Sequence, residues 1–142
     1  MIGSLQIGRS VENSDMILDI TKALGFQPLK DYHVTLVYSR KAVNWDKPIF
    51  QPINDLMLVG IHDLPVLRLG PNEDLIALGL YANALSERHT ALREAGASWD
   101  FETYRPHITL GALNPQTELP GTVTLPETLI LGPEYRESAN KN

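Results

Sequence analysis

His33-Val34-Thr35-Leu36 and His107-Ile108-Thr109-Leu110 are two copies of one tetrapeptide, within the runs YHVTLVY (residues 32–38) and YRPHITL (residues 104–110). Both runs are rich in β-branched and aromatic residues, which is typical of buried strands. Side chains two residues apart in a strand point to the same face. Each copy therefore predicts a strand with its two apolar residues on a core and its histidine and threonine on the opposite face. Docking on a core does not require that polar pair, so we expect it to have a chemical role.

The repetition of the motif changes how its histidines are interpreted. A single histidine in a strand is more often structural than catalytic, but two of the four histidines in this chain occupy equivalent places in the two copies. The other two are His62, in an expected turn, and His89, on the inner stripe of an expected helix. We interpret them as an exposed residue and a packing residue. No metal site is expected, because the histidines do not have a recognisable ligand spacing.

Patterns around the motifs predict a single α+β domain over residues 1–142. Apolar residues at helical spacing, closed by Gly25 and Gly96, predict helices over residues 14–24 and 82–95, with Asn13 or Ser14 as the first N-cap. The first motif strand is expected to end near Ser39. Short apolar runs predict further strands at residues 4–8, 56–61, 66–69 and 75–80, and a last strand that begins at residue 123 or 128 and ends at residue 131. The strands 56–61 and 66–69 are expected to pair through a turn at 62–65. Residues 40–54 are expected to form a loop, with at most a short strand at 48–50, and residues from 132 onward a polar, mobile tail.

Each motif strand follows a helix, and the two copies are about half the chain apart. This order predicts two similar lobes. Each lobe would be a small antiparallel sheet with one helix on its outer face, and the active-site cleft would lie between the lobes.

Composition narrows the classes of function. The chain has no cysteine, which excludes disulfides and thiolate metal ligands, and no apolar run is long enough to span a membrane. The first ten residues do not resemble a signal peptide, so a cytoplasmic location is expected. The net charge of −5 favours a small anionic ligand over a long nucleic acid. No phosphate-binding glycine loop is present, and no cofactor is expected.

A facing pair of histidines is suited to breaking phosphodiester bonds without a metal. One imidazole takes the proton of the attacking hydroxyl and the other gives a proton to the leaving oxygen, and an ordinary pKa near 6.5 serves both tasks. The two threonine hydroxyls can donate hydrogen bonds to the phosphate oxygens as negative charge develops there.

The doubled His-x-Thr-Leu motif resembles the 2H phosphoesterase superfamily, over nearly the whole chain. Within that superfamily, the short length and the stretches DYHVTLVYSRK and LREAGASWDFETYRPHITLG are most similar to phage-encoded anti-CBASS nucleases, which degrade the cyclic oligonucleotide signals of bacterial defence systems. The resemblance implies a bilobal fold and four catalytic residues: His33, Thr35, His107 and Thr109.

The same resemblance implies substrate-binding residues. A glutamate after the last strand holds a nucleobase in the anti-CBASS group, and Glu134 is the candidate here. A lid tryptophan expected near the C-terminus has no counterpart, and Tyr135 is the candidate in its place. From the residues themselves, Trp45 is a candidate for stacking on a base, although an anchoring role in its loop is an equal alternative. Tyr104 is a further substrate-binding candidate that also suits a core or rim position.

The two motifs predict a metal-independent phosphodiesterase, expected to be monomeric. The resemblance implies that it acts on 3′–5′ linkages in cyclic di- or trinucleotides such as 3′,3′-cyclic GMP–AMP. Two alternatives remain open. The first is an enzyme of the same superfamily that processes RNA ends, at 2′,3′-cyclic phosphates or 2′–5′ linkages. The second is a non-catalytic protein that sequesters nucleotides. The sequence does not distinguish which histidine is the base and which is the acid.

Overall fold

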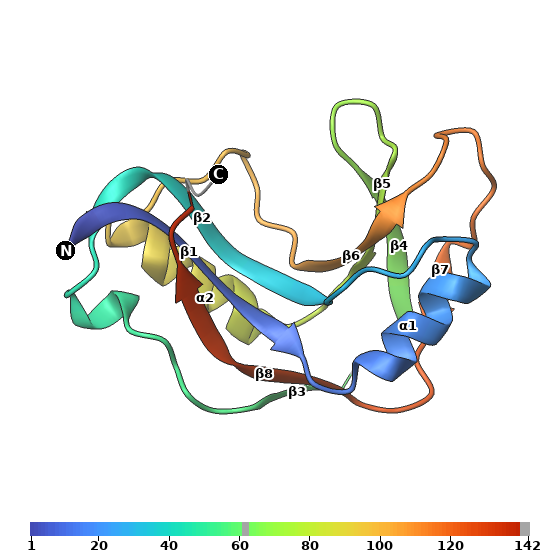
Figure 1. Ribbon diagram of the computed structural model, residues 1–142, viewed down its shortest axis with the longest axis horizontal. Helices are drawn as coiled ribbons and strands as arrows, with labels where there is room; N and C mark the ends of the chain where they lie inside the picture. Colours follow the sequence, from blue (N-terminus) through green and yellow to red (C-terminus); the bar gives the residue numbers. More distant parts are fainter. Residues whose placement is uncertain (61–62, 140–142) are drawn as a thin grey trace.

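The computed structural model describes residues 1–60 and 63–139, and its fold is α+β, as the sequence predicts (Figure 1). The helices are α1 (Ser14–Ala23), α2 (Asn83–Glu94) and the short 3₁₀ helix η1 (Pro48–Phe50). The strands are β1 (Ile2–Val11), β2 (His33–Asn44), β3 (Met57–Val59), β4 (Asp63–Leu69), β5 (Leu75–Gly79), β6 (His107–Ala112), β7 (Thr122–Thr124) and β8 (Leu129–Glu137). The two expected helices and both motif strands, β2 and β6, are confirmed.

The eight strands form one antiparallel sheet in the order β3-β8-β1-β2-β6-β5-β4-β7. Its two halves meet where the motif strands run side by side, and the pairing between β2 and β6 is recorded at one position, Val34 with Ile108. The sequence predicted two separate sheets. The structure instead has one curled sheet with a narrow junction, because the two motif strands pair with each other.

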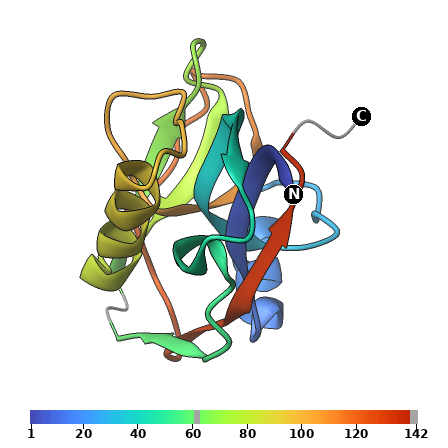
Figure 2. The same ribbon diagram turned by 90° about the vertical axis from the view of Figure 1, so that its left-hand side faces the viewer.

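The helices connect the two halves instead of each covering its own. α2 lies along β2, where Nδ1 of His89 is 2.6 Å from the carbonyl oxygen of Leu36 (Figures 1 and 2). The chain that leaves α1 brings Phe26 onto β6, so close that a Cβ added at Gly111 would lie 2.8 Å from the ring. Each motif strand is therefore supported by a segment from the other half of the chain.

The ends of α1 agree with the sequence, but its N-cap residue has a different task. Asn13 precedes the helix, and Gly25 ends it with a φ of 94°, a conformation that favours glycine. The amide of Asn13 does not cap the helix. It donates to the carbonyl of Thr128 at 2.8 Å and accepts from the backbone N–H of Ile130 at 3.0 Å. Asn13 therefore ties the start of α1 to the start of β8.

The expected hairpin of residues 56–69 is wrong. β3 pairs with β8, whereas β4 pairs with β5 and β7, so the two strands lie in opposite halves of the sheet. Both runs are apolar because each is partly covered, and apolarity does not specify a pairing partner. The predicted turn position of His62 lies outside the described residues.

Three segments are more ordered than the sequence indicates. β2 continues to Asn44, since its far end pairs with Ile2 of β1. Residues 48–50 form the helix η1, with Pro48 in its first turn, instead of a short strand. The last strand does not stop at residue 131: β8 continues to Glu137 and pairs with β1. The predicted polar tail is thus largely a strand.

The core includes the apolar residues of both motifs: Val34, Leu36, Ile108 and Leu110 have no exposed surface. Burial of one such side chain stabilises a fold by about 1.5–3 kcal/mol, so these residues fix the orientation of the motif strands. Among the described residues, no helix is both long and apolar enough to cross a lipid bilayer.

Candidate active site

The pairing of Val34 with Ile108 brings the four polar motif residues onto one face of the sheet. Because β2 and β6 are antiparallel, the residue after Val34 lies opposite the residue before Ile108, and the reverse. Thr35 therefore lies across from His107, and His33 lies across from Thr109. All four are partly exposed, whereas the paired Val34 and Ile108 are fully buried on the other face. The two motifs therefore interleave, with each histidine next to the threonine of the other copy.

Each motif strand also has a β-bulge at the same place, its leucine. In the pairing of β1 with β2, Ile7 lies opposite Val37 and Gly8 lies opposite Thr35, which leaves Leu36 unpaired. In the pairing of β5 with β6, Thr109 and Gly111 are paired and Leu110 is skipped in the same way. A bulge bends its strand and shifts the alternation of faces by one residue.

His33 is held by a carboxylate. Its Nδ1 lies 3.2 Å from Oδ2 of Asp31, and because a carboxylate only accepts, this nitrogen carries the proton. Nε2 is then the nitrogen available to a substrate. The ring of Tyr135 meets the imidazole edge to face, with 6.3 Å between the ring centres. His33 is thus oriented on two sides, while 36% of its side chain remains exposed.

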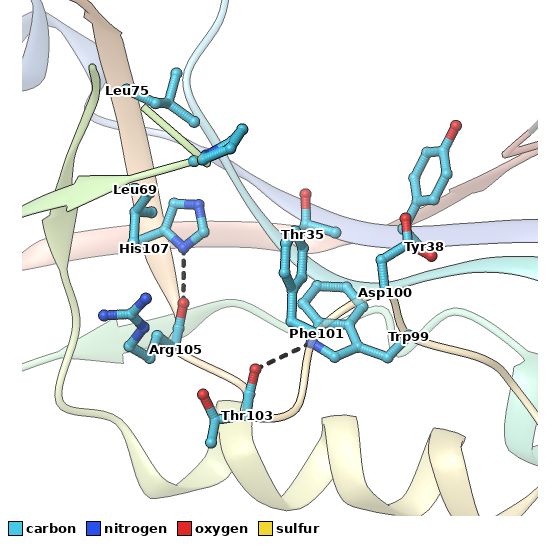
Figure 3. A pocket seen from close by; sticks show the side chains of 12 residues that line it. Thr35, Tyr38, Leu69, Leu75, Trp99, Asp100, Phe101, Thr103, Arg105 and His107 are labelled. Atoms are coloured by element: carbon cyan, nitrogen blue, oxygen red, sulfur yellow. Dashed lines mark hydrogen bonds between the residues drawn. The ribbon is translucent and has the colours of Figure 1, made fainter. Parts of the chain in front are cut away.

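His107 is held by its own chain. Its Nδ1 donates to the carbonyl oxygen of Arg105 at 2.7 Å, which again leaves Nε2 with a free lone pair (Figure 3). Burial lowers the pKa of His107 below its ordinary value of 6.5; the hydrogen bond to the Arg105 carbonyl opposes this shift, and the positive charges of Arg105 and His33 add to it. His107 is therefore neutral at pH 7, the state that a general base requires.

A pocket of about 660 Å³ opens beside His107. In Figure 3, Leu69 and Leu75 lie at one end and Tyr38 and Asp100 at the other, with His107 and Thr35 between them. The β4–β5 turn and the segment between α2 and β6 form its sides. Its lining residues are Thr35, Tyr38, Leu69, Gly70, Pro71, Leu75, Trp99, Asp100, Phe101, Thr103, Arg105 and His107.

Tyr104 lies behind the motif strand. Its hydroxyl donates to the carbonyl of Thr35 at 2.8 Å, and its ring stacks on His89 with 4.0 Å between centres. Burial raises the pKa of Tyr104, so the hydroxyl keeps its proton. Tyr104 does not line the pocket beside His107, and the structure gives it a supporting position. His89 packs on the inner side of α2, as its spacing predicts.

Glu134 is committed to other protein groups. Its carboxylate accepts two hydrogen bonds from Arg88 of α2, both at 3.0 Å, and one from the backbone N–H of Ile53 at 3.1 Å. Only 1% of its side chain is exposed. The structure thus places this candidate base-binding residue in a buried ion pair, away from the residues that line the pocket.

Trp45 lies beyond Asn44, at the end of β2 opposite to His33. Its Nε1 donates to the carbonyls of Gly3 and Ser4, each at 3.2 Å, and the guanidinium of Arg136 lies 4.7 Å from the ring centre. These contacts match the anchoring alternative, and the structure does not bring Trp45 to the motif residues.

Sequence reasoning missed several residues at the site. Arg105 is exposed, lines the pocket and makes no recorded side-chain hydrogen bond or ion pair within residues 1–60 and 63–139. Strand alternation from Thr35 predicts Val37 on the motif face, but the bulge at Leu36 brings Tyr38 to the pocket instead. Tyr135, by contrast, is the sequence candidate in place of the lid tryptophan; it lies against His33 and is not among the residues that line the pocket. Burial and the nearby carboxylates of Glu137 and Asp31 raise the pKa of Tyr135 to about 12.

The arrangement can move protons and stabilise negative charge. Two imidazoles present Nε2, two hydroxyls lie beside them, and one guanidinium borders the pocket. Within the part of the chain that the structure describes, no three histidine or acidic side chains gather to hold a metal ion.

Comparison with known proteins shows the family of this chain. The sequence model of the Anti-CBASS protein Acb1 family matches residues 5–142. The chain belongs to the Anti-CBASS protein Acb1 family. A family relative, the Anti-CBASS protein Acb1 from Caulobacter sp. (strain RHG1), is 32% identical over 150 residues, which cover 96% of this chain and 23% of the relative. The chain thus spans about a quarter of the length of that relative.

Phage members of the family have lengths closer to that of this chain. The Anti-CBASS protein Acb1 of Acinetobacter phage Ac42 is 28% identical over 141 residues, which cover 94% of this chain and 90% of the relative. That of Salmonella phage S16 is 31% identical over 115 residues, covering 81% of this chain and 71% of the relative. The expected link to anti-CBASS proteins is therefore confirmed.

Proposed function

We propose that this protein is a phosphodiesterase of the 2H type that opens 3′–5′ bonds in cyclic di- or trinucleotides and so counteracts CBASS defence. The observation that carries the proposal is the interleaving of the two motifs, which puts two imidazoles and two hydroxyls on one face at the junction of the sheet. Family membership supports the anti-defence role. The small pocket and the net charge of −5 favour a small substrate over a long nucleic acid.

In the proposed reaction His107 is the base. Its neutral Nε2 takes the proton of a ribose 2′-hydroxyl, whose oxygen attacks the adjacent phosphorus. The 2′-oxygen–phosphorus bond forms, the bond from phosphorus to the 5′-oxygen breaks, and a 2′,3′-cyclic phosphate results. The lowered pKa of His107 supports this role, since a base must begin unprotonated.

His33 is the acid in the same step. It gives a proton from Nε2 to the departing 5′-oxygen, so that each histidine completes one proton transfer. Asp31 supports this role because its carboxylate binds Nδ1 and compensates the positive charge of the protonated ring. A water molecule can then open the cyclic phosphate, and in this step the two histidines exchange their roles as base and acid.

In the proposed reaction three further groups act on the phosphate. Thr35 and Thr109 each lie next to a motif histidine, and their hydroxyls would donate to the non-bridging oxygens. Arg105 would add a positive charge at the border of the pocket. Such preorganised donors stabilise a transition state more than a ground state when the charge on the oxygens increases.

Chromatography of a substrate panel tests the proposal. The purified chain is incubated in excess EDTA with 3′,3′-cyclic GMP–AMP, with 2′,3′-cyclic AMP and with a 2′–5′-linked dinucleotide. Linear product from the first substrate at the highest rate supports the proposal. Turnover of only the other two would support RNA-end processing instead. Tight binding of the cyclic dinucleotide without product, measured by calorimetry, would support sequestration.

A further inference from the structure

Phe101 is exposed at the pocket although it is a large apolar residue. Its exposed fraction is 66%, yet it lines the same pocket as Thr35 and His107. Its position is on the segment between α2 and β6, next to Trp99 and Thr103 in Figure 3. The ring is not an isolated apolar residue, because Leu69, Leu75 and Trp99 line the same pocket, and apolar surface gathered in a groove marks ligand sites.

The ring of Phe101 has a rigid support. Trp99 packs against the core and meets Phe101 edge to face, with 5.7 Å between ring centres. Trp99 also meets His89 at 4.9 Å, and its Nε1 donates to the carbonyl of Thr103 at 3.2 Å. The aromatic wall of the pocket is therefore built on the cluster that supports the motif strand.

Hydrogen bonds on both sides of Trp99 attach the segment carrying Phe101 to β2. The backbone N–H of Ser98 donates to the hydroxyl of Ser39 at 2.9 Å, and Ser39 has no exposed surface. Asp100 accepts from Nε of Arg40 at 2.9 Å. These contacts lie on both sides of Trp99, so the wall has a defined position relative to Thr35 before any ligand arrives.

We propose that this pocket is a nucleobase subsite and that Phe101 is its stacking face. The inference rests on the proposed function, because it takes the phosphate bound at the motif histidines as the neighbour of the base. A planar base suits an exposed aromatic ring on a rigid support, and the pocket volume of about 660 Å³ lies in the range of small-ligand sites. The subsite replaces Trp45 as the stacking candidate, since Trp45 lies at the other end of β2.

Ligand-observed NMR with AMP and ribose 5-phosphate tests the subsite, because the two ligands share a phosphate and a ribose and differ by the base. We expect AMP to bind about tenfold more tightly, with the strongest saturation transfer at its base protons. Phe101→Ala should remove most of that advantage, and Phe101→Tyr should retain it. Leu58→Ala is the matched control, because Leu58 is 67% exposed and lies on β3.

Equal affinities for the two ligands, no detectable AMP binding, or full AMP affinity in Phe101→Ala would each overturn the proposal. Thermal unfolding of each variant confirms that it is folded before it is compared. The assay needs no turnover. A chain that binds AMP through Phe101 but leaves 3′,3′-cyclic GMP–AMP intact would therefore retain the subsite and refute the proposed reaction.

Discussion

Leu36 and Leu110 are equivalent residues of the two motif strands, and each is the position that a β-bulge leaves unpaired. Both side chains are fully buried. Each bulge separates the histidine and threonine of its motif from the strand segment that follows, while β2 stays paired with β1 and β6 stays paired with β5 on both sides of the bulge. The two halves of the chain therefore present the same local geometry to one junction, at Val34 and Ile108.

The pH dependence of kcat/KM should report on His107 as the base. Burial lowers its pKa below 6.5, and it must be unprotonated to act, so activity should rise with pH with a midpoint below 6.5. The measurement is kcat/KM for 3′,3′-cyclic GMP–AMP between about pH 4.5 and pH 9. An acidic limb with its midpoint above 6.5 would contradict this assignment of the base.

Arg105→Gln should move that acidic limb toward 6.5. Removing the guanidinium charge raises the pKa of His107, but burial is the larger cause of the shift, so the midpoint should stay below 6.5. kcat should also decrease, by about 100-fold, because Arg105 stabilises the charge on the phosphate in the proposed reaction. Lys22→Gln removes the same charge at the exposed end of α1 and should change neither quantity.

Glu134→Gln should affect stability more than substrate binding. Neutralising Glu134 leaves the guanidinium of Arg88 without its carboxylate, and breaking a buried pair costs about 3–5 kcal/mol. Chemical denaturation should show that loss, while KM measured on folded protein stays unchanged. Glu118→Gln, at an exposed position, is the control. A normal unfolding curve combined with a much higher KM would instead support the base-binding role implied by the family resemblance.

Stability should decrease as the pH falls below about 6.5. Burial lowers the pKa of His89 in the folded protein, whereas the unfolded chain has the ordinary value of 6.5. The unfolded chain then takes up the proton first, so the free energy of unfolding falls as pH falls from 6.5 toward the folded pKa. His107 contributes with the same sign.

Thermal unfolding at about pH 7.5 and about pH 5.5 checks this expectation. His89→Gln should lower the melting temperature at the higher pH, because the ring stacking with Tyr104 is lost. The difference between the two pH values should be smaller in this variant than in the parent chain. An equal or larger difference would mean that other groups cause the pH dependence.

Local pattern predicted the motif geometry well. Alternation in a strand was enough to put His33 with Thr35 and His107 with Thr109 opposite their buried neighbours, and helical spacing gave both helices with their glycine ends. These features depend on neighbours in the chain. The positions of the four motif residues relative to one another followed only from the pairing of β2 with β6.

Non-local contacts explain what the sequence did not predict. The polar residues Glu134 and Arg136 make most of β8 look like a tail in the sequence. In the structure, Glu134 is paired with Arg88, and the guanidinium of Arg136 lies over the ring of Trp45. The bulge at Leu36, which brings Tyr38 to the pocket, depends on the register with β1. Phe101 lies in a segment without periodicity, so its exposure beside His107 was not visible in any local pattern.

The most direct test of the two-histidine mechanism is the rate of linear product formation from 3′,3′-cyclic GMP–AMP in excess EDTA. The parent chain, His33→Ala and His107→Ala are compared after thermal unfolding has shown that all three are folded. We predict cleavage by the parent chain and a loss of at least about 100-fold in each variant, since each loses one proton transfer. Near-normal cleavage by either variant, or a parent chain that is inactive in EDTA and active with added metal, would contradict the account.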